Sequence, residues 1–230
     1  MHKQRSLSFA AIPHALIGAA FLGAIALLGL PGCGSAMIAA KEAVGIPKRD
    51  QMVARVKDAR DSQNDAKEQF QSALDEFLAV TKVSGSDLEA RYKKLTREYE
   101  ASEDSAKKVN SRIADVERVA TALFAEWQKE IGEYNSESMK SAAQQQLTQT
   151  KTKYDGLLTS MKSAAGKMAK PLGNFHDQVL FLKGNLNARA IAGLQGTAAE
   201  ISSDVEKLIR EMNISIDEAN AFISSMQPAK

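Results

Sequence analysis

The fold is decided by residues 86–127, which read SDLEARYKKLTREYEASEDSAKKVNSRIADVERVATALFAEW. Apolar side chains recur here at alternating steps of three and four residues, which places them on one face of an α-helix. The stripe consists of Leu88, Tyr92, Leu95, Tyr99, Ser102, Ala106, Val109, Ile113, Val116, Ala120, Leu123 and Trp127, and only Ser102 is polar. A stripe of more than about three or four heptads indicates a coiled coil. The stretch therefore predicts a long helix that extends to about residue 134 and packs against other helices.

The same rhythm continues on both sides of this helix. Residues 48–82 carry the stripe Val56, Ala59, Gln63, Ala66, Phe70, Ala73, Phe77 and Val80. A third helix begins near Ser136, with Ala143, Leu147, Thr150, Tyr154, Leu157, Met161, Ala164 and Met168, then Phe175, Val179, Leu182 and Leu186. Pro171 interrupts it, because proline lacks an N–H and clashes with the preceding turn. This region is predicted to be one kinked helix or two stacked helices that end near Gly193 or Gly196.

A fourth helix is expected to start at Thr197, since Thr197 and Glu200 have the spacing of a capping box, as do Ser86 and Glu89. Its stripe is Ala198, Ile201, Val205, Leu208, Met212, Ser215, Ala219, Phe222 and Met226, flanked by Ile209, Ile216 and Ile223. A stripe of this width is typical of burial against more than one helix. The prediction is an all-α fold: an elongated antiparallel bundle or coiled coil of about four long helices, whose middle hairpin is the longest.

The first 32 residues have the composition of a secretory signal peptide. Lys3 and Arg5 precede an apolar run over residues 15–30, which is shorter than the roughly 20 residues that a spanning helix needs. The run ends in Leu30-Pro31-Gly32-Cys33, which resembles the lipobox of bacterial lipoproteins, although Pro31 departs from the usual residue. The resemblance implies cleavage after Gly32 and a lipid on Cys33. The alternatives are an uncleaved signal anchor and a soluble secreted product.

By the same resemblance, Gly34 after the cysteine favours the outer membrane, with the protein facing the periplasm of the cell envelope. The expected organisation is a signal peptide over residues 1–32, the lipidated Cys33 and a short tether over 33–47, a helical bundle over 48–226, and a tail over 227–230. Multiple acyl chains are needed for stable attachment, because one chain alone binds a membrane only marginally.

Charge and residue usage exclude several classes of function. The formal net charge is +2, and removing Lys3 and Arg5 with the signal peptide leaves 28 basic and 28 acidic residues. A neutral mature chain does not favour nucleic-acid binding, which depends on clustered Lys and Arg. The chain has one cysteine, so an internal disulfide and a multi-thiolate metal site are excluded.

Few residues suggest catalysis. His176 is the one histidine beyond the signal segment, and it is expected to be a solvated side chain. The carboxylates Asp58, Asp61, Asp65 and Glu68 have helical spacing, but Arg60 and Lys67 lie among them, which favours a salt-bridged surface over a cation site. No metal, cofactor or small-molecule substrate is predicted, and an enzyme with an unrecognised site is the least favoured alternative.

Two stretches resemble a family of uncharacterised Gram-negative bacterial proteins that carry a domain of unknown function and often a lipoprotein signal. The first is Val44-Gly45-Ile46-Pro47-Lys48-Arg49-Asp50, and the second runs from Pro171-Leu172 to Leu186-Asn187. The resemblance covers most of the mature chain and implies an envelope location. It implies no activity and no site residues.

The favoured function is a non-enzymatic envelope lipoprotein that acts as a helical spacer or adaptor for a protein partner. Phe124, Trp127, Ile131 and Tyr134 lie toward the tip of the long hairpin, beyond the reach of the shorter helices. They either seal the end of the two-helix core or bind a partner protein or a second copy of this chain, since exposed apolar surface usually marks an interface. The alternative non-enzymatic function is a tether to peptidoglycan.

Replacing Cys33 with Ser tests the lipid anchor. The substitution removes the thiol that would carry the lipid, so the protein is expected to accumulate as an unprocessed precursor of higher mass. Mass spectrometry of the membrane fraction measures this. A Cys33→Ser protein that is still cleaved and still membrane-bound contradicts the lipobox interpretation.

Overall fold

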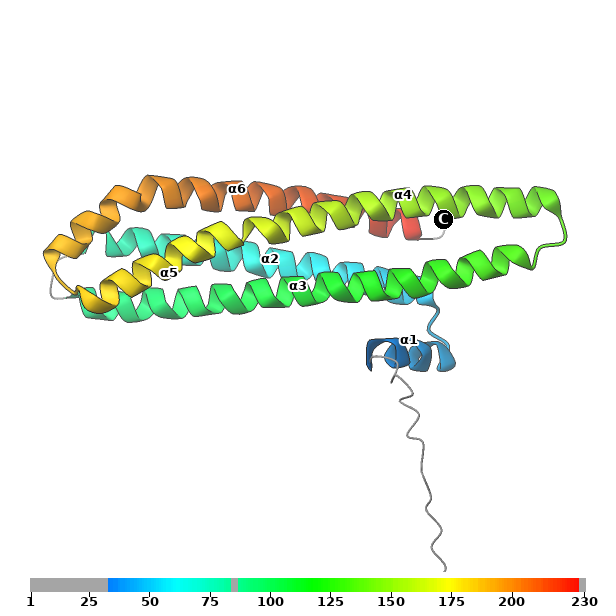
Figure 1. The fold of residues 1–230 in the computed structure, drawn as a ribbon, viewed down its shortest axis with the longest axis horizontal. Coiled ribbons are helices and arrows are strands. Elements are labelled where there is room, and N and C mark those ends of the chain that lie inside the picture. Colours follow the sequence, from blue (N-terminus) through cyan, green and yellow to red (C-terminus); the bar gives the residue numbers. More distant parts are fainter. Residues whose placement is uncertain (1–32, 84–86, 228–230) are drawn as a thin grey trace, which may run out of the picture. The chain divides into compact units, whose positions relative to one another are not determined.

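A computed structural model of the chain describes residues 33–83 and 87–227. Within these residues it contains six α-helices and no strand (Figure 1). The helices are α1 (Cys33–Ala43), α2 (Lys48–Val80), α3 (Leu88–Gly132), α4 (Glu137–Lys167), α5 (Ala169–Gly184) and α6 (Ala188–Met226). The prediction of an all-α fold is confirmed.

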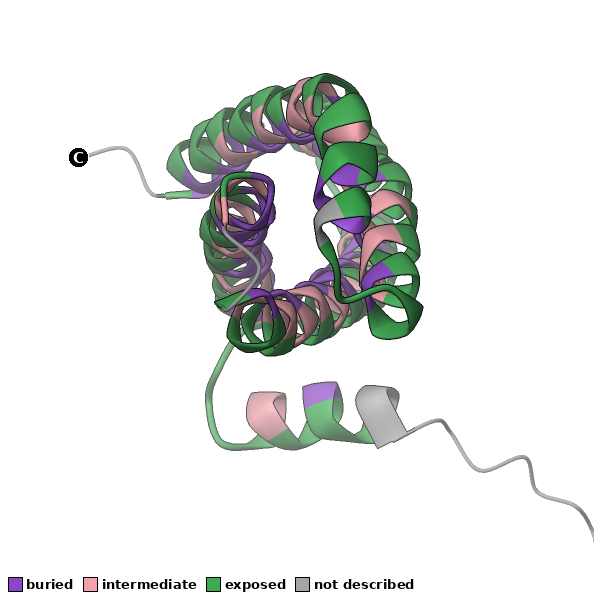
Figure 2. Ribbon diagram, turned by 90° about the vertical axis from the view of Figure 1, so that its left-hand side faces the viewer, coloured by how far each residue is buried: buried purple, intermediate pink, exposed green. Residues whose placement is uncertain are grey.

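Five of these helices surround one core. α2 packs against α3 and α6, while α4 and α5 follow one another and both pack against α3 and α6. Figure 2 looks along the helices and shows buried residues on their inner faces and exposed residues outside. The turns between α2 and α3, α3 and α4, and α5 and α6 are short, so the helices that they join run antiparallel.

The predicted stripes form this core. The eight stripe residues of α2, from Val56 to Val80, have no exposed surface. On α3, nine of the twelve stripe residues are buried, and Tyr92, Tyr99 and Trp127 are partly buried and pack against the core. On α6, Ala198 is partly buried and the rest of the stripe is buried. Sequence periodicity therefore identified the buried face of these three helices.

The helical rod that follows the hairpin turn is divided where Pro171 predicted it. α4 begins after Ser136, whose Oγ accepts a hydrogen bond from the Met139 N–H at 3.4 Å, and ends at Lys167. α5 starts at Ala169, so Pro171 lies in its first turn, where a missing N–H costs little. The structure thus has two consecutive helices in place of one kinked helix.

The start of the last helix was predicted wrongly. α5 ends at Gly184, and α6 begins at Ala188, with the Asn187 side chain accepting hydrogen bonds from the N–H groups of Arg189 and Ala190. Thr197 is an interior residue of α6, where its hydroxyl donates to the Leu194 carbonyl. Burial of Ala190, Ile191 and Leu194 offsets the helix cost of Gly193 and Gly196, which is about 1 kcal/mol each. Of the other predicted capping box, Ser86 lies outside the described residues.

The segment expected to be a tether contains a helix. α1 extends from Cys33 to Ala43 and ends in a turn in which Gly45 has φ 86°, a conformation that favours glycine. The Gly45 N–H donates to the Glu42 carbonyl at 2.9 Å and the Ile46 N–H to the Lys41 carbonyl at 3.0 Å. This turn leads directly into Pro47 and the first residue of α2.

Two buried carboxylates connect neighbouring helices. Glu76 on α2 is 4% exposed and is paired with Arg91 at 3.3 Å and Lys94 at 2.7 Å, both on α3. Asp204 on α6 is 6% exposed and is paired with Lys170 of α5 at 2.8 Å. Removing one partner of such a pair leaves a charge that is poorly solvated, so these contacts favour one register of the helices.

Val109→Asp tests the core face of α3. Val109 has no exposed surface, and an unpaired buried carboxylate is expected to lower the free energy of unfolding by more than about 4 kcal/mol. Ser111→Asp, on the exposed side of the same helix, is the control and should leave stability nearly unchanged. Thermal unfolding followed by circular dichroism measures both. Equal melting temperatures for the two variants would show that the assigned face is wrong.

Asp204→Asn tests the buried ion pair through its pH dependence. Burial raises the pKa of Asp204, but hydrogen bonds from Lys170 and Asn174 and nearby positive charges lower it more, to below its usual 3.8. A group with a lowered pKa stabilises the fold above its unfolded pKa, and that contribution disappears as the pH falls through the folded pKa. The stability difference between the parent and Asp204→Asn should therefore be constant near neutral pH and shrink below pH 3.8. A difference that does not change down to pH 2 (about two units lower) would contradict the ion pair.

Candidate functional site

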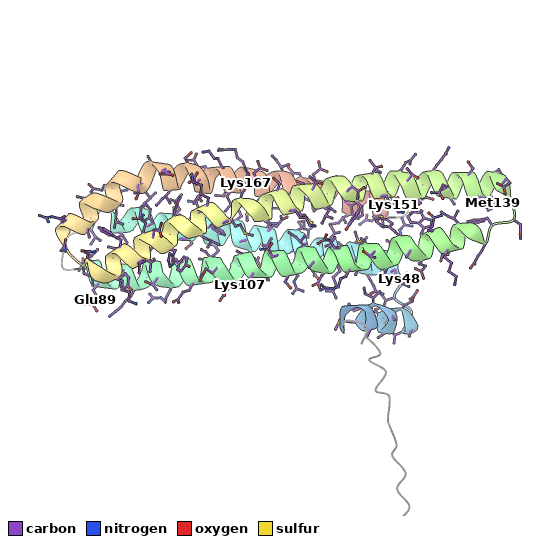
Figure 3. All side chains as sticks on the ribbon, in the orientation of Figure 1. Lys48, Glu89, Lys107, Met139, Lys151 and Lys167 are labelled. Atoms are coloured by element: carbon purple, nitrogen blue, oxygen red, sulfur yellow. The ribbon has the colours of Figure 1, made fainter. Side chains whose placement is uncertain are left out.

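The start of α2 and the end of α6 come together at the level of Glu126 on α3. Lys48 at the start of α2 donates to Glu126 of α3 at 2.9 Å. Arg49 donates from Nε to the carbonyl of Met226, the last residue of α6, at 2.8 Å. Beyond this level α3 continues to Gly132 and α4 returns from the turn. Figure 3 shows Met139 at the tip of this hairpin, beyond Lys48.

The four residues predicted to bind a partner lie in this part of α3 and its turn. Phe124 is 9% exposed and Ile131 is 2% exposed, so both face the inside of the hairpin. Trp127 is partly buried against the core, and Tyr134 is 42% exposed. Phe124 and Ile131 are therefore packing residues in this structure, and Trp127 and Tyr134 are the two that present surface to solvent.

An aromatic contact joins α3 and α4. The rings of Phe124 and Tyr154 meet edge to face, with centroids 5.3 Å apart and planes at 70°. The Lys151 ammonium lies 5.6 Å from the centroid of the Phe124 ring, within the range of a cation–π contact. Burial raises the pKa of Tyr154 to about 12, so its hydroxyl stays neutral.

A pocket of about 340 Å³ lies where the start of α2 and the end of α6 meet α3 and α4. We call it the shoulder pocket. Its lining combines the apolar Leu123, Trp127 and Met226 with the basic Lys48 and Arg49 and the acidic Glu126 and Glu130. Burial lowers the pKa of Lys48, but hydrogen bonds to Glu42 and Glu126 raise it more, so the ammonium is firmly charged. An aromatic surface bordered by both charge signs suits a peptide segment.

A second, larger groove of about 780 Å³ runs between α3 and α4 toward the tip. Most of the residues that line it carry an amide or a hydroxyl, and the Gln128 side chain on α3 donates to the side-chain amide oxygen of Gln144 on α4 at 3.3 Å. The other polar neutral residues along it are Ser141, Gln145, Thr148 and Gln149. The sequence prediction of a docking segment over residues 124–147 includes Gln128, Ser141, Gln144 and Gln145, but it did not single them out. The run Gln144-Gln145-Gln146, which makes this part of the chain unusually polar, was the available signal.

The other residues considered for chemistry are dispersed. His176 is exposed and lies beside Asp177 and the Tyr99 ring. Three of the four acidic residues proposed on α2 form separate ion pairs, Arg55 with Asp58, Arg60 with Asp61, and Lys108 of α3 with Asp65. Among the described residues, no group of three or more His, Cys, Asp or Glu side chains is placed to hold a metal ion. Cys33 is the first residue of α1.

These features define an all-helical bundle protein. A family model described as a protein of unknown function (DUF2959) matches residues 38–226, so the chain belongs to this family. The match confirms the resemblance seen in the sequence and begins inside α1, at Ile38. No curated protein and no solved structure matches the chain. In residues 33–83 and 87–227, no helix combines the length and apolar character needed to cross a membrane.

Proposed function

We propose that this protein is a lipid-anchored, non-enzymatic adaptor of the bacterial cell envelope, which holds a protein partner near the outer membrane on its periplasmic side. The observation that carries the proposal is the arrangement at Glu126. Here α2 begins, α6 ends, and the α3–α4 hairpin continues without them. Where a helix stops beside two longer helices, the surface that it would otherwise cover on them is exposed. A helical or extended segment of a partner protein can bind to such a surface.

The lengths of the helices support this reading of the fold as four antiparallel rods with the α3 hairpin as the longest. α3 has 45 residues and is about 67 Å long, while α2 has 33 residues and is about 50 Å long. The additional length of α3 lies at both of its ends, beyond Glu126 on the hairpin side and at the start of the helix. A rigid rod of this kind keeps its bound partner at a constant distance from the anchor, which is what a spacer or adaptor requires.

The shoulder pocket has the chemistry of a protein-binding site. Trp127 offers a large rigid apolar surface, and tryptophan is among the residues that most often dominate binding energy. Arg49 is exposed beside it, and Glu130 lies on the same border. Charges of both signs at the rim select the orientation of a partner rather than its affinity. The two membrane-directed features, Leu30-Pro31-Gly32-Cys33 and the apolar run before it, support the envelope location.

The groove between α3 and α4 favours a second candidate, the peptidoglycan tether. Neutral amides and hydroxyls such as those of Gln128, Gln144 and Gln145 form hydrogen bonds with sugar hydroxyls without adding charge. Sedimentation with purified peptidoglycan separates the candidates, because a tether co-sediments and an adaptor stays in solution. Gln144→Ala with Gln145→Ala should abolish co-sedimentation if this groove is responsible.

Trp127→Ala tests the adaptor at the shoulder pocket. If Trp127 anchors a partner, the substitution weakens that contact by about 2 kcal/mol or more, and crosslinks formed in cells near residues 124–147 are lost. Crosslinking with mass spectrometry and thermal unfolding are measured on the same variant.

Leu147→Ala is the matched control for that experiment. Leu147 has no exposed surface and is part of the core. Its truncation should lower the melting temperature and leave the crosslinks in place. If Trp127→Ala behaves in the same way as Leu147→Ala, Trp127 serves packing alone and the partner does not bind at the shoulder pocket.

A further inference from the structure

We propose that α1 lies on the membrane surface through its apolar outer face and holds the bundle side-on to the bilayer. This inference deepens the proposed function, since it rests on attachment to the membrane at the N-terminal end. It goes beyond the anchor itself, because it assigns a lipid-contacting surface to residues 36–47 and an orientation to the bundle.

The exposed residues of this segment carry no polar side chain. Between residues 36 and 47 the exposed positions are Ala36, Met37, Ala39, Ala40, Ala43, Val44, Gly45, Ile46 and Pro47. Met37 is 56% exposed, Val44 is 76% exposed and Ile46 is 41% exposed. A surface segment of a soluble bundle normally exposes its charged side chains to water. The exposed side chains of this segment are apolar, which contact with water disfavours.

The two charged residues of α1 are instead only half exposed. Lys41 lies in a small cleft with Asp115 and Arg118 of α3. Glu42 forms an ion pair with Lys48, and this hydrogen bond is the main reason that its pKa is lowered. The segment thus keeps its two charged side chains beside the bundle and exposes apolar side chains, which is the pattern of a helix between a protein and a lipid surface.

α1 is fastened to the bundle, so it cannot act as a free tether. Ile38 is 8% exposed and belongs to the core. The buried amide of Gln51 on α2 donates to the carbonyls of Ile38 at 3.2 Å and Ile46 at 3.0 Å. These bonds hold both ends of the segment against α2. A surface that binds α1 from outside therefore also determines the direction of the bundle.

The chain itself indicates a bilayer as the occupant of this face. Cys33, the predicted lipid site, is the first residue of α1, and the apolar run over residues 15–30 ends three residues before it. Whether the chain is cleaved and acylated or keeps that run as an anchor, the membrane-bound group is joined to the start of α1. An exposed apolar segment covalently adjacent to such a group lies within reach of the lipid interface.

The position of α1 along the bundle determines the orientation. It contacts α3 near Asp115, Arg118 and Val119, and α2 near Gln51. Arg118 is about 45 Å from the start of α3 and about 21 Å from its end. α1 therefore lies against the side of α2 and α3 rather than at an end of the bundle. With α1 on the bilayer, the α2–α3 side faces the membrane, and α6, which packs diagonally across from α3, faces away.

The experiment uses the lipidated mature protein, which begins at Cys33, in phosphatidylcholine vesicles. Because the lipid occupies Cys33, a cysteine introduced at position 37, 40 or 44 is the one free thiol and carries a nitroxide label. Ile214, 55% exposed on α6, is the matched apolar control position. Collision rates with oxygen, which concentrates in lipid, and with a nickel chelate, which stays in water, are measured at each position.

We expect the oxygen-to-nickel ratio at positions 37, 40 and 44 to be several-fold higher than at 214. Met37→Glu with Val44→Glu should abolish this difference at position 40 and leave vesicle flotation and helicity unchanged, whereas Ile214→Glu should change nothing. Labels as accessible to nickel as the control, in protein that still floats, overturn the inference. Labels shielded from both reagents also overturn it, because they indicate that a second copy or another protein covers α1.

Failure of the anchor gives a different result. If the protein is not lipidated, the mass shows no added lipid, and flotation is lost unless the run over residues 15–30 is retained as an anchor, which the mass also shows. The orientation is tested by energy transfer from dyes at Met139 and Leu180, near the two ends of the bundle, to a dye in the lipid headgroups. A side-on bundle brings both ends within transfer range, whereas efficient transfer from one end alone shows an upright bundle and overturns the proposed orientation.

Discussion

The apolar stripe of α3 has to be covered over 45 residues, and the remaining helices are arranged to do this. α2 covers it with a stripe of alanines and phenylalanines that have no exposed surface, but α2 is only 33 residues long. The rest is covered by α4 at the hairpin end and by α5 at the opposite end, with α6 closing the ring. Removing apolar surface from water at about 25 cal/mol per Å² is the main source of stability for such an arrangement.

Polar groups inside this core give it a register. The Ser215 hydroxyl on α6 donates to the Gln63 side-chain carbonyl on α2 at 3.0 Å, and neither residue has exposed surface. The Gln63 amide nitrogen has no hydrogen-bond partner among the described residues, so this pair costs stability. A slip of α6 along α2 would leave both side chains unpaired. The pair at Glu76 and the pair at Asp204 restrict the α2–α3 and α5–α6 contacts in the same way.

The functional proposals follow from where helices end. A bundle of helices of equal length would offer a partner only its side faces. Here α2 begins and α6 ends at the level of Glu126, and the shoulder pocket forms between them and the longer α3 and α4. The same first turn of α2 holds α1, since Lys48 contacts both Glu42 and Glu126. The proposed partner site and the proposed membrane contact are therefore joined through one residue, so the distance between them is set by a rigid part of the fold.

The sequence by itself determined the all-helical fold, the buried faces of α2, α3 and α6, the start of α4 after Ser136 and the break at Pro171. These depend on local periodicity, a capping side chain and a missing N–H, which are present before any tertiary contact forms. The tertiary structure decided the features that local signals could not. α6 begins at Ala188 because burial of Ile191 and Leu194 outweighs two glycines and an apparent cap at Thr197. Phe124 and Ile131 face inward, and α1 is attached through Gln51, because those positions depend on which helix lies opposite.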